Sequence, residues 1–183
     1  MARAENNTGP LLDHWNPPAG AGDAVACLAT SFTFNSEFFE EECLSRFLQL
    51  DTDPYEDGPL YLIERDEKLS QVEPISVIVD EAHCKGKRSL RWDLISFRDL
   101  QLLHSKISLL VWSNHIRIVI GSCNLTESGY RKNREIAGVF DFNASEGLDK
   151  RVLNAVINSL SAILGKLDSD HPGVQRAFGL INR

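Results

Sequence analysis

The sequence predicts a mixed α/β domain, in which a central mixed β-sheet carries helices on both faces. Residues 24–34 form an apolar, β-branched run that is typical of a buried strand. Several shorter apolar runs follow it, and residues 148–164 then carry apolar side chains at helical spacing. A chain that runs from strand to helix, through several strands, to a long helix indicates a sheet covered by helices.

The first helix is expected over residues 37–50, with Asn35 or Ser36 as its N-cap. An acidic loop, residues 51–58, follows it. Asn143 or Ser145 can cap the long final helix, and a short helix or a connection is expected after it. Further strands are expected at 59–64, 75–80, 89–97, 102–112, 116–122 and 135–142.

The 183 residues suffice for one domain with a sizeable core. Residues 1–23 are rich in Asn, Gly, Pro and Ala and are expected to form a tail or surface loop, so we expect the domain over residues 24–183. The net charge of −7 disfavours non-specific binding to nucleic acid but leaves room for a local basic groove.

The four cysteines contain no CxxC pair, which favours a reducing compartment, and we expect a cytoplasmic protein. The N-terminal stretch lacks the pattern of a signal peptide. No apolar run approaches the 18 residues of a membrane span, so no integral membrane contact is expected.

A polar cluster is predicted at one end of the hairpin formed by residues 102–122. His104 and Lys106 share a strand face because side chains alternate along a strand. If the turn has three residues centred on Asn114, His104 lies opposite Asn124 and Lys106 lies opposite Ser122. A two-residue turn would shift the register by one and break this cluster.

These side chains suit a phosphorylated ligand. An imidazole can attack phosphorus, and an ammonium and an amide can stabilise the oxygens where negative charge develops. A histidine on a strand is more often structural, however, and the basic run Arg131, Lys132 and Arg134 is either a polyanion contact or a solvated loop. The remaining histidines show no partner pattern and are expected to be structural or exposed: His14, His83, His115 and His171. No metal and no cofactor are expected.

Three motifs in order resemble the signature of the phospholipase D superfamily. They are His104-Ser105-Lys106, Gly121-Ser122-Cys123-Asn124, and Ser128 followed by Asn133-Arg134-Glu135. The usual aspartate after the lysine is replaced by Val111. The tyrosyl-DNA phosphodiesterase branch also lacks it, so this chain is most similar to that branch and to nuclease-like members.

The resemblance implies a phospholipase D-like half-domain and a role for each matched residue. His104 would be the nucleophile that forms a phosphohistidine, or the general acid for the leaving group. Lys106 and Asn124 would hold the phosphate oxygens with help from Ser122, and Glu135 would orient the imidazole. Members of this superfamily need two HxK motifs, so the resemblance implies a homodimer or a missing second half.

The leading hypothesis is a metal-independent phosphodiesterase, a nuclease or DNA-processing hydrolase whose substrate is nucleic acid. A phospholipid hydrolase or transferase would use the same chemistry. A non-catalytic nucleic-acid-binding module would keep the fold and bind phosphate without turnover.

Overall fold

The computed structural model describes residues 11–85, 89–98, 103–143 and 150–182. A six-stranded sheet organises them, and its strands β1, β3 and β5 run parallel while β6, β7 and β8 pair antiparallel. The predicted mixed sheet is therefore confirmed. In sheet order, the strands are β5 (Asp93–Phe97), β3 (Ile75–Asp80), β1 (Ala24–Ser31), β6 (Ile107–Trp112), β7 (His115–Gly121) and β8 (Ala137–Asn143).

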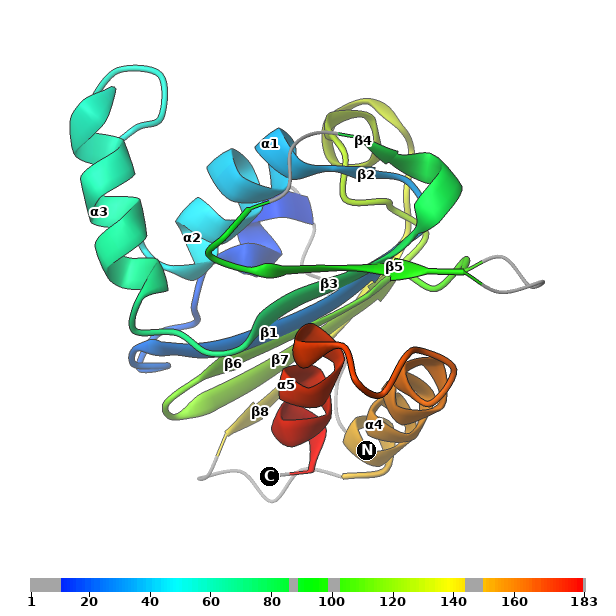
Figure 1. Cartoon of the computed structure of the whole chain (residues 1–183). Coiled ribbons are helices and arrows are strands. Elements are labelled where there is room, and N and C mark those ends of the chain that lie inside the picture. Colours follow the sequence, from blue (N-terminus) through cyan, green and yellow to red (C-terminus); the bar gives the residue numbers. More distant parts are fainter. Residues whose placement is uncertain (1–10, 86–88, 99–102, 144–149, 183) are drawn as a thin grey trace.

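Helices cover both faces of the sheet, as predicted (Figure 1). On one face the apolar sides of α4 and α5 pack against the strands, where Leu160 and Leu164 of α4 are fully buried. On the other face lies a chain of short helical turns around Phe39 and Phe47. The bounds are η1 (Leu11–Trp15), α1 (Ser36–Phe38), η2 (Phe39–Leu44), α2 (Ser45–Phe47), α4 (Arg151–Leu164) and α5 (Pro172–Ile181).

The N-terminal segment from Leu11 is part of the packed structure. Trp15 is fully buried in the core, and its Nε1 donates a hydrogen bond to the Tyr130 hydroxyl at 3.1 Å. Arg117 Nη1 also donates to the backbone carbonyls of His14 and Asn16 at 3.1 and 2.9 Å. The expected tail over residues 1–23 thus contains an ordered, tightly packed turn, while residues 1–10 lie outside the described residues.

The strand predicted at 59–64 is wrong, because this segment is the start of helix α3 (Pro59–Leu69). Proline fits the first turn of a helix, and the residues that follow are mostly strong helix formers. Only Tyr61 and Leu69 of the helix are buried, and most of its apolar side chains are exposed. The sequence therefore shows no apolar face at helical spacing in this segment.

The hairpin between β6 and β7 has a two-residue turn, since Trp112 pairs with His115. The predicted three-residue turn, and the register that followed from it, are therefore wrong. Strand β6 also begins at Ile107, so His104 and Lys106 precede the strand instead of lying in it. The described helices include none long and apolar enough to cross a bilayer.

Candidate active site

Several chain segments meet at one end of the sheet. Strands β1 and β3 are parallel and end there, the antiparallel neighbour β6 begins there, β7 ends there and β8 begins there. The loops at this end carry every residue that the motifs singled out for catalysis and phosphate binding. They are His104 and Lys106 before β6, Ser122 and Asn124 after β7, and Glu135 before β8.

The segment before β6 is anchored to the end of β1. The Thr30 hydroxyl accepts a hydrogen bond from the Ile107 amide at 3.0 Å and donates to the Ser105 hydroxyl at 3.2 Å. The Lys106 carbonyl accepts from the Gly121 amide at 3.1 Å. These bonds fix the backbone on both sides of Lys106, and they explain how an irregular segment can hold the side chains of His104 and Lys106 in place.

His104 and Lys106 lie side by side. Lys106 Nζ donates to the His104 carbonyl at 3.0 Å and lies 3.4 Å from His104 Nδ1. His104 is exposed, whereas Lys106 is only 9% exposed. Burial lowers the pKa of Lys106, while the negative charge of Glu135 partly opposes this effect. An accessible imidazole therefore lies next to a poorly hydrated ammonium, which suits a phosphate ligand.

Asn124 is fixed by the loop after β1. Its Oδ1 accepts hydrogen bonds from the backbone amides of Phe32 and Thr33, at 3.1 and 3.2 Å. The Phe32 ring in turn lies 5.2 Å from the His104 ring, between centroids, and 5.9 Å from Lys106 Nζ. Phe32 therefore links the asparagine to the His–Lys pair. No hydrogen bond from Asn124 Nδ2 to another described residue occupies that amide, so it can donate to a ligand.

Two glycines allow close approach beneath the site. A Cβ at Gly129 would lie 2.4 Å from the Asn124 carbonyl oxygen, so the turn η4 (Ser128–Lys132) packs directly on the asparagine backbone. A Cβ at Gly121 would lie 3.0 Å from the Ile136 carbonyl oxygen, so a glycine here allows another backbone segment to approach closely.

Glu135 contacts Ser122 and Asn133, and no hydrogen bond joins it to His104 within the described part of the chain. One carboxylate oxygen accepts a very short hydrogen bond from the Ser122 hydroxyl, and the other accepts from Asn133 Nδ2 at 3.1 Å. The hydrogen bonds from Ser122 and then Asn133 lower the pKa of Glu135. In this structure Glu135 acts on Lys106 through its charge, and the expected contact with the imidazole is not made.

The predicted polar side chains come together even though the predicted register of the β6–β7 hairpin is wrong. Strand alternation does not govern residues 104–106, which lie before β6, or residues 122–124, which follow β7. Hydrogen bonds from backbone amides to the hydroxyls at the end of β1 hold these loops instead: the Leu125 amide donates to Ser31 Oγ at 2.9 Å, and the Ile107 amide donates to Thr30 Oγ1 at 3.0 Å. These residues therefore meet although the turn has two residues.

The basic run is largely paired with carboxylates. Arg131 forms an ion pair with Glu42 at 2.6 Å, and Lys132 forms one with Glu127 at 3.1 Å. Arg134 is exposed and takes part in none of the ion pairs formed among the described residues. Of the predicted substrate contacts in this run, Arg134 is therefore the cation best placed to contact a polyanion.

Sequence reasoning missed two groups of residues. Thr30, Ser31 and Phe32 support the site, and their position directly after a buried strand was the available signal. His83 is exposed, which agrees with the expectation that it is structural or exposed, and its Nδ1 lies 2.8 Å from the buried Asp80 carboxylate, a pairing that was not predicted. An aspartate that ends a strand, with a histidine three residues later, was the signal for this pair.

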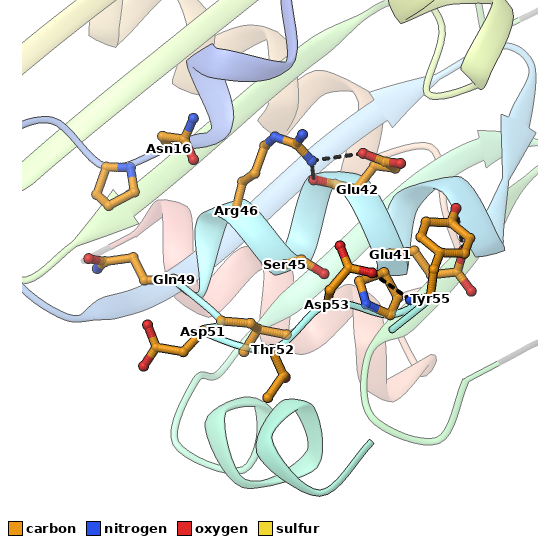
Figure 2. Close-up of a pocket in the computed structure, with 13 residues that line it drawn as sticks. Asn16, Glu41, Glu42, Ser45, Arg46, Gln49, Asp51, Thr52, Asp53 and Tyr55 are labelled. Carbon is orange, nitrogen blue, oxygen red and sulfur yellow. Dashed lines mark hydrogen bonds and ion pairs between the residues drawn. The ribbon is translucent and has the colours of Figure 1, made fainter. Parts of the chain in front are cut away.

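A separate surface pocket of about 490 Å³ lies between the helical turns η2 and α2 and the acidic loop (Figure 2). Its carboxylates are Glu41, Glu42, Asp51 and Asp53, and its arginine, Arg46, is paired with Glu42. A phosphodiester would be repelled there. Across the described ranges, no three His, Cys, Asp or Glu side chains are grouped so that they could hold a metal ion.

No protein-family model matches the chain, and no curated protein matches its sequence. Its structure is similar to solved structures of the yeast tyrosyl-DNA phosphodiesterase. One of these structures gives a TM-score of 0.53 with 12% identity, and the match covers 87% of this chain and 34% of the yeast chain. The structure of the H432N mutant gives a TM-score of 0.51 with 15% identity, and the match covers 77% of this chain and 32% of the yeast chain. Nuc from Salmonella typhimurium, a phospholipase D family member, gives 0.47 at 14% identity over 86% of each chain.

The chain therefore spans about a third of the yeast enzyme's length. Its strand order, its helical layers and its similarity to that enzyme agree with the fold that the motifs implied. The chain has the phospholipase D fold and carries the residues of one HxK motif at the end of its sheet.

Proposed function

We propose that this chain is a metal-independent phosphodiesterase in which His104 attacks phosphorus. The observation that carries the proposal is the grouping of His104, Lys106 and Asn124 around Phe32, at one end of a phospholipase D-type sheet. An exposed imidazole, a poorly hydrated ammonium and an amide with a free donor are together suited to a phosphodiester.

The proposed reaction has two steps. A ring nitrogen of His104 attacks phosphorus, the bond to the leaving oxygen breaks, and a phosphohistidine forms. Water then attacks phosphorus and gives a proton to the group that protonated the leaving oxygen, the nitrogen–phosphorus bond breaks, and His104 is released. Lys106 and Asn124 donate to the non-bridging oxygens in both steps, where negative charge develops. The hydrogen-bonded pair of Ser122 and Glu135 keeps a carboxylate near Lys106, which favours the charged ammonium.

Nucleic acid is the proposed substrate. Its support is the fold that the chain shares with an enzyme whose name is tyrosyl-DNA phosphodiesterase, together with exposed cations at Arg134 and Lys85. The net charge of −7 and the ion pairs of Arg131 and Lys132 oppose tight non-specific binding. We therefore propose that the protein acts on short single strands or strand ends, which need few phosphate contacts.

The leaving oxygen needs a proton, so the reaction requires a second acid beside His104. The resemblance implies that this acid lies on a second HxK motif. A homodimer, or the second half of a longer chain, would bring that motif to the site. Sedimentation of the chain at assay concentration distinguishes a dimer from a monomer.

The proposal is tested by hydrolysis of bis(para-nitrophenyl) phosphate and of single-stranded DNA in EDTA. We expect His104→Ala to lower the rate by at least about 10³-fold, because a nucleophile is lost. The matched control is His171→Asn. His171 is the N-cap of α5 and lies near the start of β5, at the end of the sheet opposite the candidate site, and asparagine keeps the N-cap. Equal rates for the wild type and His104→Ala would overturn the proposal. Hydrolysis of phosphatidylcholine vesicles, assayed in parallel, would reveal a lipid substrate.

A further inference from the structure

A pair of aromatic rings borders the candidate active site. The Phe32 ring lies 4.1 Å from the His83 ring, measured between centroids, and the two ring planes are inclined by 37°. We call these two rings the ring pair. The Phe32 ring also lies 5.2 Å from the His104 ring, so the separation of His83 from His104 cannot exceed these two distances laid end to end. A phosphate at His104 and a base at His83 can therefore belong to one nucleotide or to adjacent nucleotides.

Main-chain pairing places the ring pair at the site. The short strands β2 (Phe34–Asn35) and β4 (Cys84–Lys85) pair in parallel (Figure 1). The first residue of β2 also forms a bridge to Leu125, which directly follows Asn124. His83 directly precedes β4, so the position of its ring beside the loops of the site follows from backbone contacts.

Asp80 holds the His83 ring in a fixed orientation. Asp80 Oδ1 lies 2.8 Å from His83 Nδ1 and also accepts a hydrogen bond from the Ala82 amide at 3.2 Å. The Asp80 side chain is 8% exposed, whereas that of His83 is 40% exposed. A neutral imidazole can donate a proton on Nδ1 to this carboxylate as well as an imidazolium can. Because the ring is already held in place, little side-chain entropy is lost when a ligand packs on its open face.

The charged groups around the ring pair favour a nucleotide backbone. Lys85, two residues after His83, is exposed and takes part in none of the ion pairs formed among the described residues. The exposed carboxylate of Glu81 is ion-paired with Arg98, which balances its negative charge. Lys106 Nζ lies 5.9 Å from the phenyl ring of the pair. Each ring therefore has a lysine close by, in the chain or in space, and this arrangement suits a base with a phosphate on either side.

We propose that the ring pair is a stacking platform for one nucleobase of a single-stranded substrate, and that Lys85 contacts the phosphate beyond that base. The proposal rests on the function proposed for His104 and holds for either source of the second HxK motif. The base stacks on the open face of His83 while the reacting phosphate lies at His104. Every base has an aromatic face, so the platform is tolerant of sequence. Bases inside a duplex are covered on both faces, so the platform selects single strands and strand ends.

The test compares three dinucleotides that contain a single phosphodiester, so the reacting phosphate fixes how each one lies in the site. Thymidylyl-thymidine carries a base on both sides of the phosphate, and the other two substrates each lack one of these bases. For the wild type, we expect removal of one particular base to lower kcat/KM by about 5–100-fold, because stacking on a protein ring contributes that much to binding. Removal of the other base should have a smaller effect. Equal kcat/KM for all three substrates would overturn the proposal.

Variants of His83 assign the base preference to the ring pair. In His83→Ala the same base should change kcat/KM by less than about twofold, whereas His83→Phe should keep the full preference because it restores a ring. Each ratio compares two substrates on one protein, so a loss of folded protein cancels. The matched control, His171→Asn at the opposite end of the sheet, should keep the preference of the wild type. An unchanged preference in His83→Ala would contradict the assignment.

Lys85 is tested with a phosphate added to the terminal hydroxyl next to the stacked base. This phosphate should raise kcat/KM for the wild type, and Lys85→Gln should remove most of the gain while keeping the base preference. No gain in the wild type, or the same gain in Lys85→Gln, would overturn the phosphate contact.

A binding measurement separates this inference from the proposed function. We expect His104→Asn protein, which cannot turn over, to quench the fluorescence of a dinucleotide that carries 2-aminopurine in place of the stacked base. Addition of His83→Ala should abolish the quenching, and addition of His83→Phe should not. Hydrolysis by His104→Ala at the rate of the wild type would overturn the function assigned to His104, whereas absence of quenching with 2-aminopurine at either position would overturn the platform.

Discussion

Gly129 offers a direct test of how the site is built, because its backbone lies against that of Asn124. A Cβ at this position would lie 2.4 Å from the Asn124 carbonyl oxygen and 3.0 Å from its amide nitrogen. Ordinary contact begins near 3.4 Å, so Gly129→Ala must push the two segments apart by about an ångström. Both neighbours are backbone, and no side-chain rotation can relieve the clash.

The displacement should affect both stability and catalysis. Overpacking of this kind costs about 1–3 kcal/mol in the free energy of unfolding, which urea denaturation measures. Moving Asn124 by about 1 Å should lower kcat/KM for bis(para-nitrophenyl) phosphate by about 10²-fold.

The matched control is Gly179→Ala, since a Cβ at Gly179 meets no atom within 4 Å. Gly179 is exposed within helix α5, so the change should stabilise the protein by about 0.5–1 kcal/mol and leave activity unchanged. A Gly129→Ala protein with the stability and activity of the wild type would refute the account of how Asn124 is supported.

Three further predictions concern charge and the core. Lys106→Met should lower kcat/KM by about 10²–10³-fold, because the phosphate loses its ammonium, and a loss below tenfold would argue against that role. Burial alone would raise the pKa of Asp141, but hydrogen bonds from Arg117 and His115 outweigh it and hold the pKa below its usual 3.8. The ionised carboxylate therefore stabilises the protein at pH values above 3.8, and this stabilisation is lost as the pH falls below 3.8. Asp141→Asn should lower the free energy of unfolding by about 1–2 kcal/mol at neutral pH and by much less in strong acid. Urea titrations that find the same cost at both pH values would contradict this. Trp15→Ala should cost about 3–5 kcal/mol, and a cost under 1 kcal/mol would show that the N-terminal turn does not belong to the core.

Local patterning predicted much of the fold. Buried strands such as β1 and β3 were recognisable because nearly every residue in them is apolar or small. Helix α4 was recognisable because Val156, Leu160 and Leu164 repeat at helical spacing. Helix α3 was not, because it stands at the edge of the fold and buries only Tyr61 and Leu69.

The site was predicted as a set of residues but not as a geometry. Motif order identified His104, Lys106 and Asn124, which the structure brings together. The way they meet depends on non-local contacts from Thr30 and Ser31, far away in the sequence, and no local pattern reports such contacts. The same limit hid His83, whose neighbour Phe32 lies about fifty residues earlier in the chain.

The central claim is that His104 becomes covalently bound to phosphorus during turnover. It is tested by quenching the wild type with alkali while it hydrolyses thymidine para-nitrophenyl phosphate in EDTA, followed by mass spectrometry of the tryptic peptide that ends at Lys106. Alkali preserves a phosphohistidine bond, so we expect a thymidyl phosphate adduct on His104 in the wild type and none in His104→Ala. Turnover without an adduct on this peptide, or with the adduct on another residue, would contradict the claim.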